Sequence, residues 1–296
     1  MSGTTTIPGA VRAVLPNSRR QHFQHGPIDL VIECFGESSD VRHAYDQAWD
    51  RFETILAELA GELSELRTVI SATSVVTGTT ARRMIAACRP HARQFVTPMA
   101  AVAGAVADEI LDALSAGRIL QRAYVNNGGD IAVHLAPGET FTTGLVILGE
   151  APAVAGTLRL RSDQGVRGIA SSGWRGRSLS RGIADSVTVL ASSAAVADAA
   201  ATLIANDVYV ETPTVRQVPA QSLDPESDLG DRLVTVAVGD LASAEISQAL
   251  DAGSATAQAM LSAGLIHATY LALAGKSRVI GAAPSLIDLA RQQEAA

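Results

Sequence analysis

Six short apolar runs between residues 119 and 191 constrain the fold of this chain more than any other feature. Each run has the length of a strand, and glycine-containing turns lie between them. Such a series is typical of antiparallel hairpins, so we expect a mostly antiparallel sheet in the middle of the chain. The predicted strands are 119–125, 130–135, 142–148, 156–161, 166–171 and 186–191.

Helical patterns lie on both sides of this block. The clearest covers about 41–66, where apolar residues recur at alternating spacings of three and four after the capping oxygens of residues 38–40. A second helix begins at Pro98, at the first-turn position where proline is tolerated, and ends near Gly117. Other helices are expected over 79–88, 193–205, 243–250 and 254–262, and other strands over 28–35, 267–274 and 277–281.

These elements predict an α+β fold, with helices packed on a mostly antiparallel sheet, in one domain over 28–296. Residues 1–27 are polar and end at Gly26-Pro27, which predicts a flexible N-terminal arm. Residues 211–231 are rich in proline, serine and acidic residues, which predicts an excursion from the domain.

Charge and composition exclude several functions. The net charge of −7 gives no basic footprint, so we expect no nucleic-acid partner. Lys276 is the only lysine, so a Schiff base would have to form there and no Walker A motif exists. Charged residues make up 18% of the chain, below the ~25% of an average domain. This low charge and the small-residue helix at 98–117 predict a homodimer.

The chain shows no sign of export or of a membrane span. Cys34 and Cys88 match neither a disulfide framework nor a zinc spacing. Residues 1–9 contain no apolar segment typical of a secretory signal, and the longest apolar stretches contain polar residues. We therefore expect a cytoplasmic protein with no membrane partner.

The turn from Asn127 to Asp130 is the first candidate site. Asn127, Gly128 and Gly129 are ordinary hairpin chemistry, so a structural role alone accounts for them. In a functional role, the glycines would bring backbone amides close to a ligand. Asp130 would then bind a hydroxyl or amine of that ligand from the mouth of a buried strand.

The segment Ser171-Ser172-Gly173 ends a predicted strand and is the second candidate. It is either a strand-to-loop cap or a contact for phosphate or ribose through its hydroxyls and the Gly173 amide. Arg175, Arg177 and Arg181 follow at once. They are either a solvated loop or a cluster that attracts a diphosphate.

Asp198 and Thr202 form the third candidate. They are four residues apart in an alanine-rich helix, so they share one face. A buried carboxylate is costly unless it is paired, hydrogen-bonded or bound to a metal. Oxygen ligands of this kind suit Mg²⁺, which keeps several waters and takes few protein ligands together with phosphates.

In this order, the three segments resemble the ApbE superfamily of FAD:protein FMN transferases. In that family a Gly-Gly-Asp turn, a Thr/Ser-Ser-Gly segment and an Ala-Asp-x-x-x-Thr helix line the flavin and magnesium site. The resemblance is strongest over residues 98–207. With residues 97–104 included, the chain is most similar to an uncharacterised branch of short cytoplasmic ApbE-like proteins. The resemblance implies an ApbE-like fold around a T-fold-type sheet.

The resemblance also implies roles for individual residues. Asn127, Gly128, Gly129 and Asp130 would hold part of a flavin ligand such as FAD, while Ser171, Ser172, Gly173 and Arg175 would contact its phosphate or ribose. Mg²⁺ would be bound by Asp198 and Thr202, in a site shared with the diphosphate. Asp130 and Asp185 are the candidates for the catalytic base. A partner protein would supply the threonine that accepts FMN.

One departure from the family keeps other functions open. The family's His-x-x-x-Pro-x-Thr-Gly segment is missing, and residues 178–185 stand in its place. The leading hypothesis is Mg-dependent transfer of FMN from FAD to a protein threonine. The alternatives are a hydrolase, hydratase or isomerase acting on a small heterocyclic substrate on the same scaffold, or a non-catalytic flavin binder.

Overall fold

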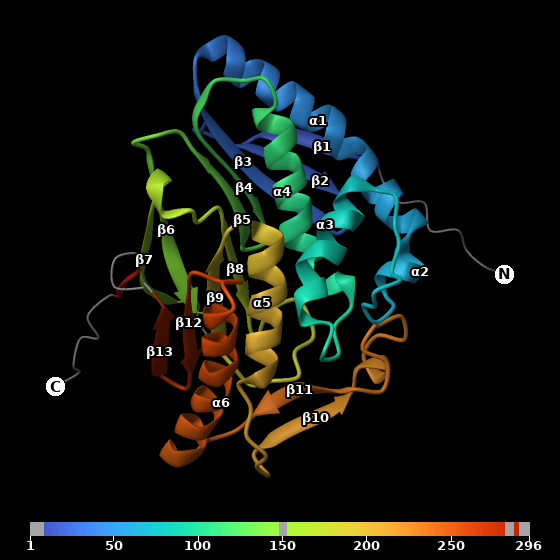
Figure 1. Ribbon diagram of the computed structural model, residues 1–296, viewed down its shortest axis with the longest axis vertical. Coiled ribbons are helices and arrows are strands. Elements are labelled where there is room, and N and C mark those ends of the chain that lie inside the picture. The colour runs from blue at the N-terminus through green and yellow to red at the C-terminus, as the bar shows by residue number, and fades with distance from the viewer. Residues whose placement is uncertain (1–8, 148–152, 282–286, 290–296) are drawn as a thin grey trace.

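A nine-stranded antiparallel sheet forms the centre of the molecule (Figure 1). The computed structural model describes residues 9–147, 153–281 and 287–289. The strand order is β1-β2-β3-β4-β5-β8-β9-β12-β13, and each strand runs antiparallel to its neighbours. These strands are β1 Val11–Val14, β2 Gln21–His25, β3 Ile28–Gly36, β4 Leu120–Asn127, β5 Asp130–Leu135, β8 Gly168–Ser172, β9 Ser186–Ala191, β12 Ala268–Leu273 and β13 Lys276–Gly281.

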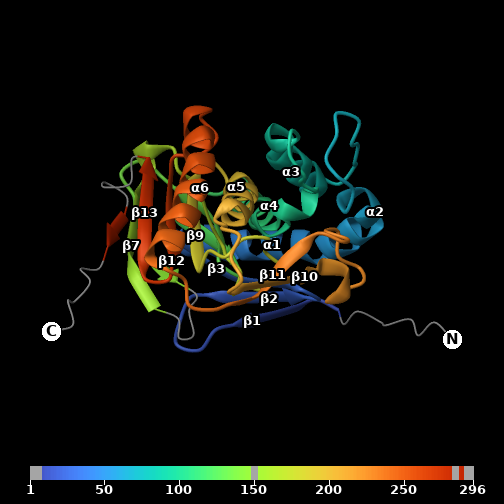
Figure 2. The same cartoon turned by 90° about the horizontal axis from the view of Figure 1, so that it is seen from below.

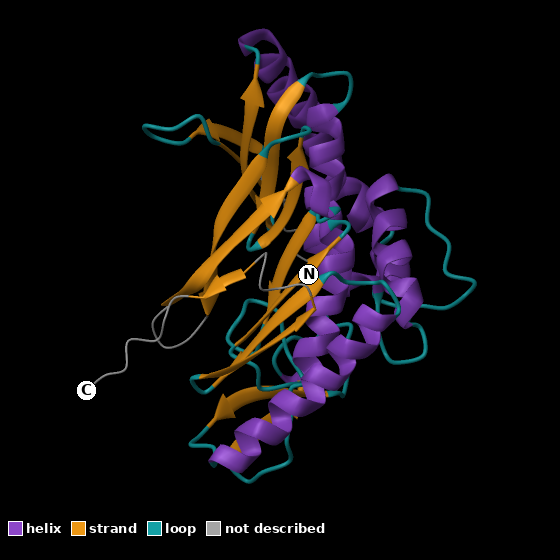
Figure 3. Ribbon diagram, turned by 60° about the vertical axis from the view of Figure 1, so that its left-hand side comes forward, coloured by secondary structure: helices purple, strands orange, loops and turns teal. Residues whose placement is uncertain are grey.

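Helices cover one face of this sheet, and Figures 2 and 3 show them gathered on the same side of the strands. They are α1 Ser38–Gly61, α2 Leu63–Leu66, α3 Thr79–Cys88, α4 Val102–Ser115, α5 Ala194–Asp207 and α6 Ser243–Ser262, with short 3₁₀ turns at η1 Arg89–His91, η2 Pro98–Ala101, η3 Ser162–Gln164 and η4 Ala220–Ser222. The observed architecture confirms the predicted α+β class with a mostly antiparallel sheet.

Two smaller sheets complete the fold. One has the order β14-β7-β6 and packs on the face of the main sheet that the helices leave free. The other is the two-stranded sheet β10-β11. β10 lies within the predicted excursion 211–231, and β11 follows it in the chain. Their strands are β6 Thr140–Ile147, β7 Ala153–Arg161, β10 Val215–Pro219, β11 Leu233–Val238 and β14 Ile287–Leu289.

The main sheet therefore separates two apolar cores. The larger core joins the helices to side chains such as Leu30 and Ile32 of β3. The smaller joins β5, β8, β9 and β12 to Leu145 and Leu158 of the small sheet. All residues of β9 and β12 are buried because these strands are covered on both faces, whereas burial in β3 alternates along most of the strand.

Helices α4 and α5 pack unusually closely because small residues line their contact. A Cβ atom at Gly104 of α4 would lie only 2.3 Å from the carbonyl oxygen of Ala194. The small-residue helix that predicted a dimer is largely buried inside the chain, against α1, α3 and α5. The homodimer remains a prediction, but this helix does not supply its interface.

The N-terminal arm predicted for 1–27 differs from the structure. Residues 1–8 lie outside the described part, but β1 and β2 form a hairpin that extends the main sheet next to β3. The physical reason is Phe23, which is fully buried and packs edge-on against Trp49 at 5.1 Å and near Phe52 at 5.4 Å. One aromatic anchor thus holds an otherwise polar segment in the sheet.

Three predicted helical regions also differ from the observed helices. The helix predicted over 41–66 breaks near Gly61 into α1 and α2, and the helix predicted from Pro98 begins as the 3₁₀ turn η2. The two helices predicted over 243–250 and 254–262 form one helix, α6. Gly253 does not interrupt α6, because it is buried where the helix packs closely on Val208. Residue 148, at the end of one predicted strand, lies outside the described residues.

Candidate functional site

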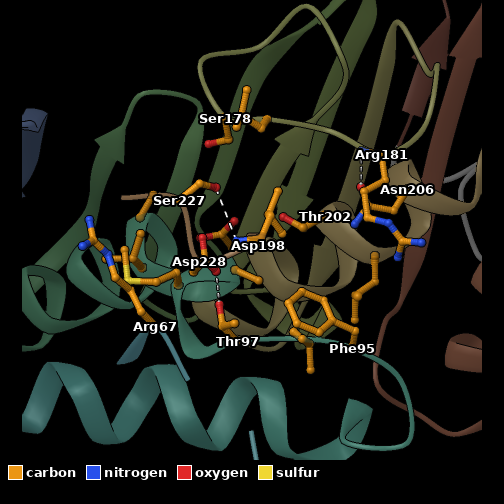
Figure 4. Close-up of a pocket in the computed structure, with 18 of the residues that line it drawn as sticks. Arg67, Phe95, Thr97, Ser178, Arg181, Asp198, Thr202, Asn206, Ser227 and Asp228 are labelled. Carbon is orange, nitrogen blue, oxygen red and sulfur yellow. Dashed lines mark hydrogen bonds between the residues drawn. The ribbon is translucent and has the colours of Figure 1, made fainter. Parts of the chain in front are cut away.

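A cavity of about 350 Å³ lies between the start of α4, one face of α5 and two loops (Figure 4). The loops are 177–181 and 224–229, and Asp130 at the start of β5 also lines the cavity. Asp198, Thr202 and Asn206 project from α5 at successive intervals of four residues, so they share the face that lines the cavity.

The position of α5 depends on a carboxylate from the neighbouring helix. Asp108 of α4 is buried and accepts hydrogen bonds from the Ala194 amide at 2.9 Å and the Ala195 amide at 2.8 Å. These amides have no partner within the helix because they belong to its first turn. Ser193 adds a hydrogen bond from the Val196 amide to its own hydroxyl. The two helices are thus connected where they approach most closely.

Asp198 is held by the N-terminus of α4. Its Oδ2 atom accepts a hydrogen bond from the Gly104 amide at 3.0 Å, and the Ala103 amide also favours its charged form. The free amides at the start of α4 thus face the carboxylate of Asp198. The Thr202 hydroxyl, one turn along α5, has no hydrogen-bond partner among the residues that the structure describes.

Asp130 faces the same cavity, and its Oδ1 atom accepts a hydrogen bond from the Ser171 amide at 3.2 Å. Burial raises the pKa of Asp130 to about 7, against the opposing effects of the Ser171 amide and the Arg177 guanidinium. Burial, and then the nearby Asp130 carboxylate, raise the pKa of Asp198 well above its usual range. A cation between the two carboxylates would relieve this repulsion.

Guanidinium groups surround the carboxylates. Arg177, Arg181 and Arg67 line the cavity. Arg67 pairs with Glu226 at 3.0 Å, whereas Arg177 and Arg181 form no salt bridge with a carboxylate among the described residues. Arg177 lies directly over Gly128, where a Cβ atom would be 1.8 Å from its Nη2 atom. Guanidinium groups that form no salt bridge are suited to an anionic ligand such as a phosphate.

The other residues of the turn between β4 and β5 do not line the cavity but hold Asp130 in position. Asn127 is buried, and its side chain donates to the Ala103 carbonyl at 3.1 Å, which connects the end of β4 to the start of α4. Gly128 and Gly129 have φ values of 66° and 116°, which favour glycine. The Gly129 amide donates to the Asn126 side chain at 2.8 Å. The turn therefore presents Asp130 to the cavity.

The serine segment lies beside the cavity and does not line it. The Ser171 hydroxyl pairs with Thr188 at 2.8 Å, and its amide holds Asp130. Gly173 is buried, and a Cβ atom there would meet the Asp185 carbonyl oxygen at 2.7 Å. Ser172 belongs to the end of β8. The contact of Ser171, Ser172 and Gly173 with a phosphate or ribose remains a prediction.

Asp185 and Arg175 lie away from the cavity. The Asp185 carboxylate accepts a hydrogen bond from the Ala274 amide at 2.7 Å, and Arg175 approaches it at 3.7 Å. Arg175 also stacks on Trp174 at 4.3 Å from the ring centroid. Neither residue lines the cavity, so the structure does not bring these two candidates to Asp198 and Thr202.

The predicted excursion forms one wall of the cavity, and this role escaped the sequence analysis. Asp228 accepts a hydrogen bond from Thr97 at the start of η2, and Arg232 stacks on Phe95 at 3.3 Å from the ring centroid. The Arg67–Glu226 salt bridge is a third attachment. The acidic and proline-rich composition of residues 211–231 did not indicate that they form a cavity wall. Arg177 and Arg181, in contrast, belong to the arginine cluster that the sequence singled out.

The donors fit a magnesium ion that a ligand helps to bind. Among the described residues, no group of three or more His, Cys, Asp or Glu side chains is arranged to hold a metal ion by itself. Asp130, Asp198 and the Thr202 hydroxyl nevertheless bring oxygen atoms to one cavity. Mg²⁺ is commonly bound by one or two carboxylates together with water and substrate phosphates.

A protein-family model matches most of the chain. Residues 12–279 match the family model described as AbpE bacteria. Two relatives are UPF0280 proteins of archaea. The protein of Methanothrix thermoacetophila is 39% identical over 123 residues, 41% of this chain and 50% of that protein. The protein of Methanothermobacter thermautotrophicus is 42% identical over 120 residues, 40% of this chain and 45% of that protein. The matches thus cover half or less of these relatives.

Two solved structures show a distant likeness. The flavinyl transferase ApbE of Pseudomonas stutzeri, in its apo form, has a TM-score of 0.48 and 13% identity, over 95% of this chain and 96% of that one. The ApbE protein of Thermotoga maritima has a TM-score of 0.44 and 12% identity, over 92% and 96%. Over the part of this chain that the structure describes, no helix is both long and apolar enough to cross a membrane.

Proposed function

Since the chain belongs to the family described as AbpE bacteria, we propose that it binds FAD in the cavity beside Asp198 and, with Mg²⁺, transfers FMN to a threonine of an acceptor protein. One observation carries the proposal. Asp198, Thr202 and Asp130 line one cavity together with Arg177 and Arg181, which form no salt bridge with a carboxylate in the described part of the chain. Oxygen donors for a cation thus lie next to cationic donors for a diphosphate.

The residues take separate parts in the reaction. Asp198 and Thr202 would hold Mg²⁺, which when bound supplies positive charge against the diphosphate oxygens and polarises the phosphorus that is attacked. Arg177 and Arg181 bind the remaining phosphate oxygens. The amides of α4 keep Asp198 oriented through the Gly104 contact at 3.0 Å. This arrangement places charge where it develops in the transition state.

Asp130 is the proton acceptor in this proposal. The threonine hydroxyl oxygen forms a bond to the FMN-side phosphorus, and the bond between that phosphorus and the bridging oxygen breaks. AMP leaves with the bridging oxygen, and the hydroxyl proton passes to Asp130, which lines the same cavity from the start of β5. Asp185 is not used, because its carboxylate accepts from the Ala274 amide outside the cavity.

A second candidate function is a flavin binder without transferase activity. No histidine lines the cavity among the described residues, and Ser178, Leu179 and Arg181 occupy the place of the family's histidine-containing segment. The same observation leaves open an enzyme that acts on a small heterocyclic substrate. Retention of Asp198 and Thr202 on the cavity favours the transferase over both.

The test combines FAD binding with AMP release. We expect FAD fluorescence to change on titration with the protein, and AMP to be released when Mg²⁺ is present but not when it is chelated. Asp198→Asn should lower AMP release by roughly 10²-fold or more, because several kcal/mol of charge stabilisation depend on the metal. Asp251→Asn is the matched control, since Asp251 is exposed and forms a salt bridge with Arg278 at 3.4 Å, outside the cavity.

The outcomes separate the candidates. FAD binding with AMP release that depends on Asp198 supports the transferase. FAD binding without AMP release, even with threonine-containing acceptor proteins added, identifies a binder. If FAD does not bind at all, the flavin proposal is wrong and small heterocyclic substrates should be tested.

A further inference from the structure

A second cavity, of about 530 Å³, lies on the face of the main sheet that points away from the helices, because its lining residues on β3 alternate with those that pack against the helices. Strands β3 and β4 form its floor, and β6 of the small sheet forms one wall. Among the described residues it shares no lining residue with the first cavity. Nothing in the proposed flavin chemistry uses it.

The register of β3 and β4 places polar and aromatic groups side by side on this floor. Glu33 lies opposite Tyr124, and Phe35 lies opposite Arg122. The Tyr124 hydroxyl donates to Glu33 at 3.1 Å, and the Arg122 guanidinium stacks over the Phe35 ring at 4.0 Å from its centroid. Cross-strand pairs of this kind hold their side chains in defined positions.

The floor stays open because the small sheet ends at β6. Side chains of β5 on this face, such as Val133, are buried under β6 and β7. Beyond β5, Phe141 of β6 packs toward β4, with its ring centroid 5.4 Å from that of Tyr124. Aromatic residues make up only 4% of the chain, yet Phe35, Tyr124 and Phe141 all line this cavity.

The two charged residues on the floor, Glu33 and Arg122, differ in the contacts that they make. Glu33 is occupied, because it accepts from Tyr124 and pairs with Arg20 at 3.4 Å. The Arg122 guanidinium forms no hydrogen bond or salt bridge with any described residue, and it stacks on the Phe35 ring. Its planar group of donors is therefore held in one place by stacking and free to bind an anion.

We propose that this second cavity binds a small aromatic anion, a planar ring that carries a carboxylate or a phosphate. Arg122 binds the anionic group through its free N–H donors, and the ring lies against Tyr124 and Phe141. Threonine hydroxyls of β6 at 140, 142 and 143 line the same wall and supply further hydrogen-bonding groups. A volume of about 530 Å³ lies within the range of small-molecule sites.

Phenyl phosphate and 2-aminobenzoate are the probes, and titration calorimetry on the full chain is the measurement. The two probes distinguish a phosphate from a carboxylate as the preferred anion. Aniline has the ring without the anion, and inorganic phosphate has the anion without the ring. We expect at least one probe to bind at least 10-fold more tightly than either of these two controls.

Three variants locate the binding. Arg122→Gln should weaken probe binding at least 10-fold, and Arg122→Lys should also weaken it, because lysine keeps the charge but loses the planar fork. Arg159→Gln removes the same charge from an exposed position on β7 and should change nothing. Thermal unfolding of each variant shows whether the fold is retained.

Two results would overturn the proposal. One is that neither probe binds more tightly than aniline or inorganic phosphate. The other is that binding persists in both Arg122 variants and is lost in Arg177→Gln, which would place the probe in the first cavity. A misfolded Arg122→Gln variant leaves Arg122→Lys to decide the question.

Discussion

Replacing Gly104 by alanine brings two physical effects into direct opposition. Alanine is the better helix former by up to about 1 kcal/mol, so propensity alone predicts a more stable protein. The structure predicts the reverse. The added Cβ atom would lie 2.3 Å from the Ala194 carbonyl oxygen, 2.4 Å from its carbon and 2.7 Å from the Ala195 nitrogen. These are backbone atoms, so no side-chain rotation relieves the contact.

The cost follows from the movement that is required. Ordinary contact begins at 3.4 Å, so α4 and α5 must separate by about 1 Å. Overpacking of this kind costs about 1–3 kcal/mol. The separation also stretches the two hydrogen bonds from Ala194 and Ala195 to Asp108, and hydrogen bonds to a charged group are worth about 1.5–3 kcal/mol each. After the gain in propensity, we expect Gly104→Ala to lose about 2–4 kcal/mol of unfolding free energy.

Urea unfolding followed by circular dichroism measures this change, and Gly61→Ala is the control. Gly61 is the last residue of α1, its φ angle is not positive, and nothing lies within 4 Å of the Cβ position. Gly61→Ala should therefore stabilise the protein, by about 0.4–1 kcal/mol. If Gly104→Ala proves as stable as the wild type, the argument from close helix packing is wrong.

Two further predictions concern the pH dependence of stability and the turn that presents Asp130. Burial raises the pKa of Glu109, but hydrogen bonds from a threonine, Arg51 and Arg83 outweigh it, so the pKa is lowered. The stabilisation is therefore present above the unfolded-state pKa of about 4.3 and lost as the pH falls through the folded-state pKa. Glu109→Gln should cost about 2 kcal/mol or more at pH 7 in urea unfolding, and the difference from wild type should shrink below about pH 4; a constant difference would contradict this. Asn126→Ala removes the acceptor of the Gly129 amide and should cost about 1 kcal/mol in the same assay, with weaker FAD binding, whereas unchanged stability and binding would show that the turn needs no such bond.

Much of the fold was predictable because most elements carry a local pattern. The strands of the middle block and helices α3, α4 and α5 lie close to their predicted positions, since apolar periodicity and turn residues specify them locally. The β1–β2 hairpin was not predictable, because a single aromatic residue, Phe23, anchors it through contacts with a distant helix. The single helix α6 was missed for a related reason, since Gly253 serves packing on Val208 instead of ending a helix.

The candidate site was also predictable where a local sequence pattern specifies it, and not where long-range contacts do. Asp198 and Thr202 were predictable as a pair because helical spacing alone places them on one face. The structure adds Asp130 to the same cavity and leaves Asp185 outside it. The 224–229 wall depends on long-range attachments such as Thr97–Asp228 and Arg67–Glu226, which join residues far apart in the sequence. No local pattern encodes such contacts, so composition suggested only an excursion.

The contacts that hold α4 against α5 also determine the chemistry of the cavity. The positive end of a helix stabilises a nearby anion, and at α4 that anion is Asp198 of the protein itself. The same turn of α4 contains Gly104, whose missing side chain lets α5 approach, and Asp108 follows one turn later to hold the first amides of α5. A change that separates the helices therefore acts on stability and on the orientation of Asp198 together. We conclude that the small residues at this contact are required for the site as well as for the fold.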